Sequence, residues 1–221
     1  MDFLIHRLLE ESLAEEIESK LTDQSASWQN GKKTAGSHAA TVKNNFQLDR
    51  DSQISKQLTK KIIEEITQDP LIKSFSLPKN FHGLMFAKAG PGQGYGMHVD
   101  NAYMSTGRSD LSFTIFLSDP NSYQGGELSI QTLQGSQEIK LSSGEIVIYP
   151  STSLHGVEEV KEGERIVCVG WIESYISSNE DRNLLFGLDA GAKGILAEHG
   201  QSQQLNLIFQ AYNNLLRRLG D

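Results

Sequence analysis

Between residues 81 and 172, short apolar segments alternate with turn-forming clusters, and this pattern constrains the fold more than any other feature of the sequence. Such short segments are typical of strands, and the clusters at 119–122 and 124–126 are rich in the Asp, Pro, Asn, Ser and Gly that form tight connections. The pattern predicts strands at 81–88, 111–117, 126–131, 136–141, 144–149 and 165–172. Their close spacing favours an antiparallel sandwich or jelly roll.

Amphipathic segments flank this β region on both sides. Leucine and isoleucine recur at a four-residue spacing from 9 to 21, which predicts a helix over residues 3–22. A second helix is predicted from about residue 52 to 67, and Asp69-Pro70 should end it, since proline keeps the preceding residue out of the helical region. Helical patterning returns beyond Asn179. The leucines of this last segment suit either a cover for the β core or a subunit contact, and we favour the cover.

These elements describe a mainly β fold with flanking helices. Residues 1–77 are predicted to form an N-terminal helical and loop support, 78–177 the β core, and 178–221 a C-terminal helical extension. We find no internal repeat, low-complexity tract or linker long enough to separate a free domain.

Composition excludes several classes of function. The net charge of −8 argues against nonspecific nucleic-acid binding, which depends on clustered Lys and Arg. No apolar run approaches the roughly 20 residues that a membrane helix needs. The single cysteine, Cys168, forms no internal disulfide, so we expect a reducing, cytoplasmic setting. Because apolar residues surround it, Cys168 is interpreted as a buried packing residue rather than a reactive thiol.

Three side chains between 98 and 155 have the composition of a metal site. His98 and Asp100 are two residues apart, so in an extended segment both point to the same face and can converge on one ion. His155 follows the predicted strand at 144–149 and a turn. Two histidines and one carboxylate form the facial triad that binds iron(II) and leaves the remaining positions for substrate and oxygen.

Arg165 adds a second requirement to this site. In the last predicted strand it alternates with its neighbours so that it shares a face with Val167, Val169 and Trp171, which indicates a pocket rather than open solvent. A guanidinium is a planar donor fork that matches a carboxylate. We therefore expect Arg165 to bind the carboxylate of an organic acid beside the metal.

A His-x-Asp pair by itself is weak evidence, because surface loops often contain one. The combination of His98 and Asp100 with His155 and Arg165 in a β context carries the prediction. The glycine-rich segment 90–94 lacks the Lys-Ser/Thr of a phosphate-binding loop and does not precede a helix, so it is interpreted as a loop before the metal-binding segment.

Around these residues the chain resembles the PKHD-type hydroxylases, a branch of the iron(II)/2-oxoglutarate oxygenases related to prolyl 4-hydroxylases. The resemblance is carried by Tyr95-Gly96-Met97-His98-Val99-Asp100-Asn101-Ala102 and by the segments 109–112, 121–128, 149–155, 163–165 and 171–174. It extends to 42–45 and 214–218, so it covers nearly the whole chain, and jointly these motifs are highly specific.

The resemblance implies a double-stranded β-helix, or jelly-roll, core in which His98, Asp100 and His155 hold Fe(II). It implies that 2-oxoglutarate chelates the iron through its 2-oxo acid end while Arg165 binds its distal carboxylate. The implied reaction is hydroxylation with O₂, which converts 2-oxoglutarate to succinate and CO₂, with L-ascorbate keeping the iron reduced. The substrate is unidentified, and both a peptidyl proline and a small molecule linked to iron uptake fit the resemblance.

Two positions depart from the family pattern. Ala89 stands where relatives carry a Tyr, and Val167 stands where some oxygenases of this class carry a Ser beside the Arg. The hydroxyl partner of the distal carboxylate is therefore open, with Ser112 and Thr114 as candidates.

Two other function classes also stay open. One is a noncatalytic module that senses iron or 2-oxoglutarate, although a sensor has no need of a complete triad with an open position for oxygen. The other is a hydrolase that uses a zinc-bound water, which leaves Arg165 without a role.

Overall fold

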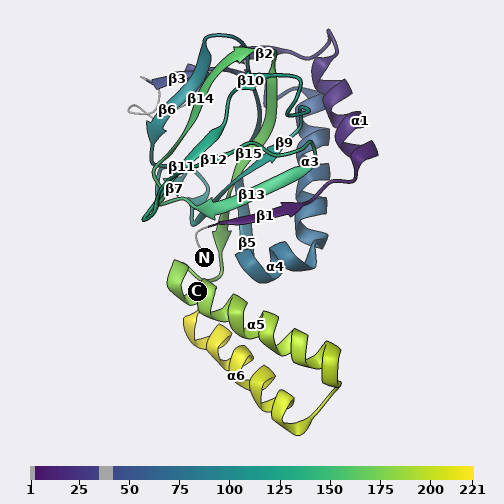
Figure 1. Cartoon of the computed structure of the whole chain (residues 1–221), viewed down its shortest axis with the longest axis vertical. Coiled ribbons are helices and arrows are strands. Elements are labelled where there is room, and N and C mark those ends of the chain that lie inside the picture. Colours follow the sequence, from purple (N-terminus) through teal and green to yellow (C-terminus); the bar gives the residue numbers. More distant parts are fainter. Residues whose placement is uncertain (1–2, 35–41) are drawn as a thin grey trace.

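The computed structural model describes residues 3–34 and 42–221, and antiparallel β-sheets form its centre (Figure 1). The strands are β1 (Leu4–Arg7), β2 (Trp28–Asn30), β3 (Lys43–Asn44), β4 (Phe46–Leu48), β5 (Pro78–Ala89), β6 (Gln93–His98), β7 (Tyr103–Met104), β8 (Gly107–Arg108), β9 (Leu111–Phe116), β10 (Gln124–Gly125), β11 (Leu128–Thr132), β12 (Gly135–Ile139), β13 (Glu145–Pro150), β14 (His155–Glu162) and β15 (Arg165–Ser174). Among the described residues, the larger sheet has the order β1-β13-β9-β15-β5-β4-β2 and the smaller one β12-β11-β14-β6-β3. Strand β10 pairs with β14, and β7 pairs with β8. The predicted antiparallel jelly roll is confirmed.

Alternation along β15 divides the interior into two apolar regions. Ile166, Cys168 and Ile172 face the helices, where they join the larger hydrophobic core. Val167 faces the smaller sheet and packs in a second core between the two sheets. The same alternation places Arg165 on the inner face, as the sequence predicted.

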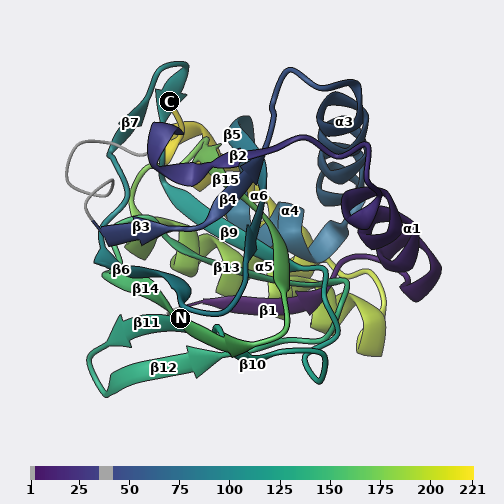
Figure 2. The same ribbon diagram turned by 90° about the horizontal axis from the view of Figure 1, so that it is seen from above.

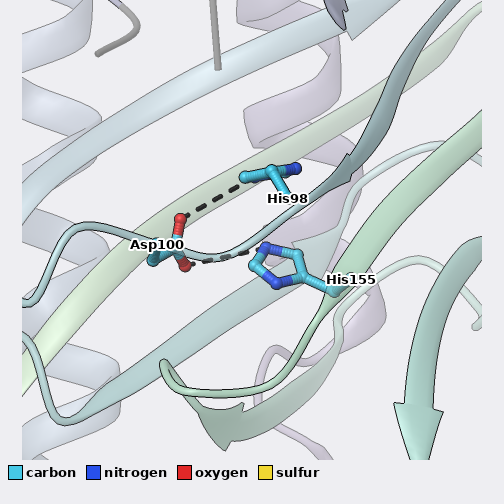
Figure 3. Close-up of side chains that lie close together, drawn as sticks. All are labelled: His98, Asp100 and His155. Carbon is cyan, nitrogen blue, oxygen red and sulfur yellow. Dashed lines mark ion pairs between the residues drawn. The ribbon is translucent and has the colours of Figure 1, made fainter. Parts of the chain in front are cut away.

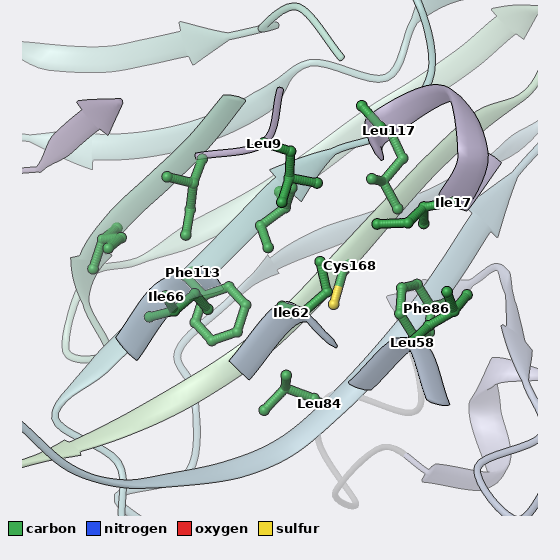
Figure 4. Close-up of a cluster of buried hydrophobic side chains, with 14 of the residues drawn as sticks. Leu9, Ile17, Leu58, Ile62, Ile66, Leu84, Phe86, Phe113, Leu117 and Cys168 are labelled. Atoms are coloured by element: carbon green, nitrogen blue, oxygen red, sulfur yellow. The ribbon is translucent and has the colours of Figure 1, made fainter. Parts of the chain in front are cut away.

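The helices are α1 (Glu11–Thr22), α3 (Gln53–Gln68), α4 (Pro70–Ser76), α5 (Asn179–His199) and α6 (Gln203–Leu219), with a short 3₁₀ turn, η1, at Gly31–Thr34. Helices α1 and α3 lie together on one side of the sandwich (Figure 2). Their buried residues Ile17, Ile62 and Ile66 meet Phe113 and Cys168 of the larger sheet (Figure 4). Truncating one of these isoleucines to alanine removes about 2–5 kcal/mol of stability, so this contact anchors the sheet that carries Arg165.

Local signals account for the boundary between α3 and α4. Ser52 caps α3 by accepting a hydrogen bond from the backbone N–H of Ser55. Asp69 ends α3 and also caps α4, because its carboxylate accepts from the N–H of Ile72 and Pro70 occupies the first turn, where no N–H is needed. The predicted end of the helix before Pro70 is confirmed, and a new helix begins there.

The predicted helix over residues 3–22 is wrong at its start. Residues Leu4–Arg7 form β1, which pairs with β13 at the edge of the larger sheet, with Leu4 opposite Ile148 and Arg7 opposite Glu145. This segment lies before the four-residue spacing that starts at Leu9, so edge pairing determines its structure, and the helix begins at Glu11. Strands β6 and β14 were not predicted, since their sequences lack a continuous apolar run.

The C-terminal helices do not cover the β core, contrary to the prediction. Helices α5 and α6 form an antiparallel hairpin that leaves the end of β15 and extends away from the sandwich, beyond α4 (Figure 1). No helix among the described residues is long and apolar enough to cross a membrane. The first 77 residues contribute β1 to β4 to the two sheets as well as helices, and the domain boundaries themselves stay a prediction.

Candidate active site

His98, Asp100 and His155 converge inside the cavity between the two sheets (Figure 3). One ligand atom from each lies within 4.8 Å of the others. His98 Nε2 is 3.8 Å from Asp100 Oδ1, and His155 Nε2 is 3.6 Å from Asp100 Oδ2. The structure thus brings the three predicted ligands to a single point.

Strand register explains this convergence. His155 begins β14 and lies directly opposite His98, the last residue of β6. Residues paired across antiparallel strands project to the same face, so both imidazoles enter the cavity. Asp100 follows two residues later in an extended segment and keeps the same side.

Backbone carbonyls fix how the two imidazoles are oriented. His98 Nδ1 lies 2.9 Å from the carbonyl oxygen of Gly96, and His155 Nδ1 lies 3.0 Å from that of Ser153. Because a carbonyl only accepts, each Nδ1 carries the proton and donates. The unprotonated Nε2 atoms then face Asp100, which is the arrangement of metal-binding histidines with outer hydrogen-bond partners.

Electrostatics favour the neutral imidazole that a metal requires. Burial lowers the pKa of His98, and the nearby His155 lowers it further. The Tyr95 ring stacks on His98, with a centroid separation of 3.8 Å, and the Tyr149 ring meets His155 edge-on at 5.0 Å. These contacts hold both ligands in place before any ion binds.

Asp100 is held from the opposite sheet. Ser112 Oγ donates a hydrogen bond to Asp100 Oδ2 at 2.6 Å, and Ser112 and Ser151 share a hydrogen bond at 2.8 Å. Ser112 was a candidate partner for the distal carboxylate of 2-oxoglutarate. The structure places it on the carboxylate of Asp100 instead.

The cavity around the triad measures about 230 Å³ and extends along the inner face of β15 to Arg165. Arg165 is only 5% exposed, and its Nε and Nη2 atoms have no hydrogen-bond partner. Burial lowers the pKa of its guanidinium, and no carboxylate of the described residues forms an ion pair with it. A buried cation left in this state is costly. An anionic ligand at this position would offset that cost.

Two tyrosines and Thr114 surround this end of the cavity. Ala89 lies directly across the strand pair from Arg165, so the Tyr expected there from the family pattern is absent. The Tyr123 hydroxyl is buried close to Arg165, and its interaction with the guanidinium partly offsets the effect of burial on the pKa of Arg165. Burial also raises the pKa of Tyr149 well above its ordinary value, which keeps that hydroxyl protonated as a donor. Thr114 lines the cavity as well and stays a candidate partner for the distal carboxylate.

Gly126 permits the close packing beside Arg165. It adopts a positive φ of 69°, and a Cβ there would lie 2.9 Å from Cδ of Arg165 and 3.2 Å from the Tyr123 ring. A larger residue at 126 would displace the guanidinium.

Sequence reasoning identified the triad and Arg165 but missed Tyr149, Tyr123 and Ser151. Tyr149 and Ser151 precede His155 by six and four residues, whereas Tyr123 lies far from it along the chain, and a lone Tyr or Ser carries no spacing signal. Only the strand register places them beside the site.

Comparison with known proteins agrees with this geometry. Residues 84–173 match the model of the 2OG-Fe(II) oxygenase superfamily. A PKHD-type hydroxylase of Prochlorococcus marinus strain MIT 9211 is 63% identical over 221 residues, which is 100% of both chains. Another from strain MIT 9313 is 62% identical over 220 residues, again 100% of both.

Solved structures share the fold at low sequence identity. A Pseudomonas putida prolyl-4-hydroxylase has a TM-score of 0.54 at 18% identity, covering 78% of this chain and 92% of its own. A prolyl hydroxylase from Trichoplax adhaerens, in complex with a hypoxia inducible factor peptide fragment, has a TM-score of 0.58 at 15% identity, with coverage of 83% and 86%. At these identities the likeness shows the jelly-roll fold alone.

Proposed function

This chain belongs to the PKHD-type hydroxylases within the 2OG-Fe(II) oxygenase superfamily, and on this premise we propose how its residues divide the work of hydroxylation. His98 and His155, through Nε2, and Asp100, through its carboxylate, hold Fe(II). Arg165 binds the distal carboxylate of 2-oxoglutarate. The single observation that carries this assignment is the meeting of a His-Asp-His cluster and an unpaired buried guanidinium in one cavity.

The bound iron and 2-oxoglutarate supply the oxidising chemistry, which consumes O₂, releases succinate and CO₂, and hydroxylates a second substrate. The chain's own residues prepare the site for it. The carbonyls of Gly96 and Ser153 keep Nε2 of each histidine free for the metal. Buried Leu128 and Val167 form apolar walls that exclude water near Arg165. L-ascorbate is proposed to keep the iron in its ferrous state.

Two substrate classes fall within the proposal. A peptidyl proline is supported by the likeness in fold to prolyl hydroxylases, one of which is in complex with a peptide fragment. A small molecule linked to iron uptake is supported by the family resemblance. Fold likeness does not choose between them.

The test is succinate formation from 2-oxoglutarate with Fe(II), O₂ and ascorbate. We expect slow succinate release by the native protein without the second substrate, and none by His155→Ala. His199→Ala is the matched control, because His199 is an exposed histidine at the end of α5, and it should behave as the native protein does.

Three outcomes contradict parts of the proposal. Succinate release by His155→Ala at the rate of the native protein would contradict the assignment of His155 as a metal ligand. Binding of 2-oxoglutarate with no turnover, even with candidate substrates, favours the sensor. Zinc rather than iron in protein purified without oxygen favours the hydrolase.

A further inference from the structure

Two cationic side chains lie in the part of the cavity away from Arg165. Lys43 and Arg50 line it together with Met85, Val169 and Trp171, and we call these five residues the outer wall. Lys43 is 6% exposed, so its ammonium has lost most of its contact with water. Neither Lys43 nor Arg50 forms an ion pair with a carboxylate of the described residues.

Strand pairing places Lys43 close to the His-Asp-His cluster. Lys43 of β3 lies opposite Tyr95 of β6, and its Nζ is 5.2 Å from the centre of the Tyr95 ring. That ring stacks on His98. One aromatic ring therefore separates the ammonium of Lys43 from His98, so an anion bound by Lys43 would lie close to the triad.

The positive charges of Lys43 and Arg50 repel one another across the cavity. Burial lowers the pKa of Lys43 to about 8, and the charge of Arg50 adds to the effect. The charge of Asp100 raises the pKa of Lys43 and so opposes both effects, but a metal bound at the triad would neutralise that charge. Two like charges facing an apolar cavity, in a chain whose net charge is −8, are stabilised when an anion lies between them.

The guanidinium of Arg50 lines the cavity and makes one weak contact there, with the sulfur of Met85. Its Nη2 lies 3.6 Å from Sδ of Met85, a poor acceptor, so its donors are available to a ligand. Lys88, which also lines the cavity, is different, because its ammonium is 3.2 Å from Glu164 and lies over the Trp28 ring. Among the described residues that line this part of the cavity, the cations without an ion pair are thus Lys43 and Arg50.

We propose that the hydroxylated substrate carries a carboxylate on an apolar body, with Lys43 and Arg50 binding the carboxylate and Met85, Val169 and Trp171 contacting the body. This inference rests on the proposed function and narrows its substrate. Lys43 supplies a point charge and Arg50 a planar fork. Arg50 contacts Met85, which pairs with Val169 of β15. Val169 is four residues from Arg165, about 13 Å at 3.3 Å per residue, so the cosubstrate carboxylate and the substrate carboxylate bind at separate positions in the cavity.

The experiment compares two ligands of the same shape. Cyclohexanecarboxylate and the neutral cyclohexanecarboxamide are titrated into protein loaded with redox-inactive Zn(II) and saturating 2-oxoglutarate. Trp171 fluorescence reports binding, in a Trp28→Phe background that leaves Trp171 as the one remaining tryptophan of the two in the chain. We expect the carboxylate to bind at least about tenfold more tightly than the amide, since only the carboxylate pairs with the two cations.

Variants assign the preference to residues. Lys43→Met and Arg50→Gln should each reduce the carboxylate preference about threefold or more and leave amide binding unchanged. Lys88→Gln is the matched control, since Lys88 is a lining cation already paired with Glu164, and it should keep the preference. Arg50 is exposed, so Arg50→Gln stays informative if Lys43→Met fails to fold.

The result that overturns the inference is the absence of a charge preference, whether both ligands bind equally or neither binds. A preference that survives Lys43→Met and Arg50→Gln also overturns it. Loading with 2-oxoglutarate is measured first, so its failure contradicts the proposed function separately. In that case the same titration of the Zn(II)-loaded protein still decides the carboxylate preference.

Discussion

Ser112 Oγ donates a 2.6 Å hydrogen bond to Asp100 Oδ2, and this bond joins the two sheets at the metal site. Asp100 follows β6 of the smaller sheet, whereas Ser112 belongs to β9 of the larger one. The imidazoles come from the paired strands β6 and β14. The triad is therefore assembled on one sheet and its carboxylate is oriented from the other.

Replacing Ser112 with alanine should weaken Fe(II) binding about 10- to 100-fold, because outer hydrogen bonds fix the orientation of a ligating carboxylate. Anaerobic titration with Fe(II), read by metal-dependent protection against thermal unfolding, measures the effect. Ser151→Ala should cost less, since Ser151 contacts Ser112 rather than Asp100. Unchanged affinity in Ser112→Ala, or an equal loss in Ser151→Ala, would contradict this chain of contacts.

Arg165→Met should have opposite effects on binding and on stability. Without ligand the guanidinium is buried and two of its nitrogens are unpaired, so an apolar side chain of similar length should raise the melting temperature. The same change should abolish the stabilisation that 2-oxoglutarate gives to the metal-loaded native protein. The loss of a buried charge pair, about 3–5 kcal/mol, corresponds to a fall in affinity of more than 100-fold.

Two controls separate charge from geometry at Arg165. Arg165→Lys keeps a cation but loses the planar fork, so it should bind 2-oxoglutarate weakly. Arg218→Met changes an exposed arginine in the last turn of α6 and should alter neither property. A lower melting temperature in ligand-free Arg165→Met, together with retained 2-oxoglutarate binding, would refute the role given to Arg165.

Local spacing was enough to predict which of His98, Asp100 and Arg165 face the cavity, although the roles given to these residues stay predictions. His98 and Asp100 share a face by their two-residue separation, and Arg165 shares one with Val167 by alternation. These are properties of a single strand, and the structure keeps them.

Contacts between strands could not be predicted from the local spacing of residues. Tyr149 meets His155 because of where β13 and β14 lie in separate sheets, and Lys43 meets Tyr95 because the two-residue strand β3 pairs with β6. The segment Leu4–Arg7 precedes the four-residue spacing that begins at Leu9, and it pairs with the edge of β13 as a strand. Such outcomes depend on tertiary pairing rather than on local pattern.

Cys168 should be unreactive in the folded protein. Its side chain is fully buried in the core between the larger sheet and the helices, and burial raises the pKa of the thiol far above its ordinary value. Because the thiolate is the reactive form, a thiol reagent at mildly alkaline pH should label the native chain only as fast as the chain unfolds. Labelling in denaturant supplies the full signal for comparison. Rapid labelling of the native protein would contradict the packing described for β15.

Binding of the carboxylate at the outer wall should weaken as pH rises through about 8, which is the pKa of Lys43. The protonated ammonium binds the anion, and its population falls about tenfold per pH unit above the pKa. The groups that face Lys43 are Arg50, Asp100, His98 and Tyr95. Burial raises the pKa of Tyr95 to about 12, and the pKa of His98 lies below its ordinary value, so neither titrates between about pH 7 and about pH 9.

Titrations of cyclohexanecarboxylate over that range check the sign of the effect. The ligand stays ionised throughout, so a loss of affinity towards high pH reports on the protein. Lys43→Met should bind weakly at every pH, with a flat profile, and cyclohexanecarboxamide should be independent of pH. An affinity that rises with pH, or a slope that persists in Lys43→Met, would show that another group governs the binding.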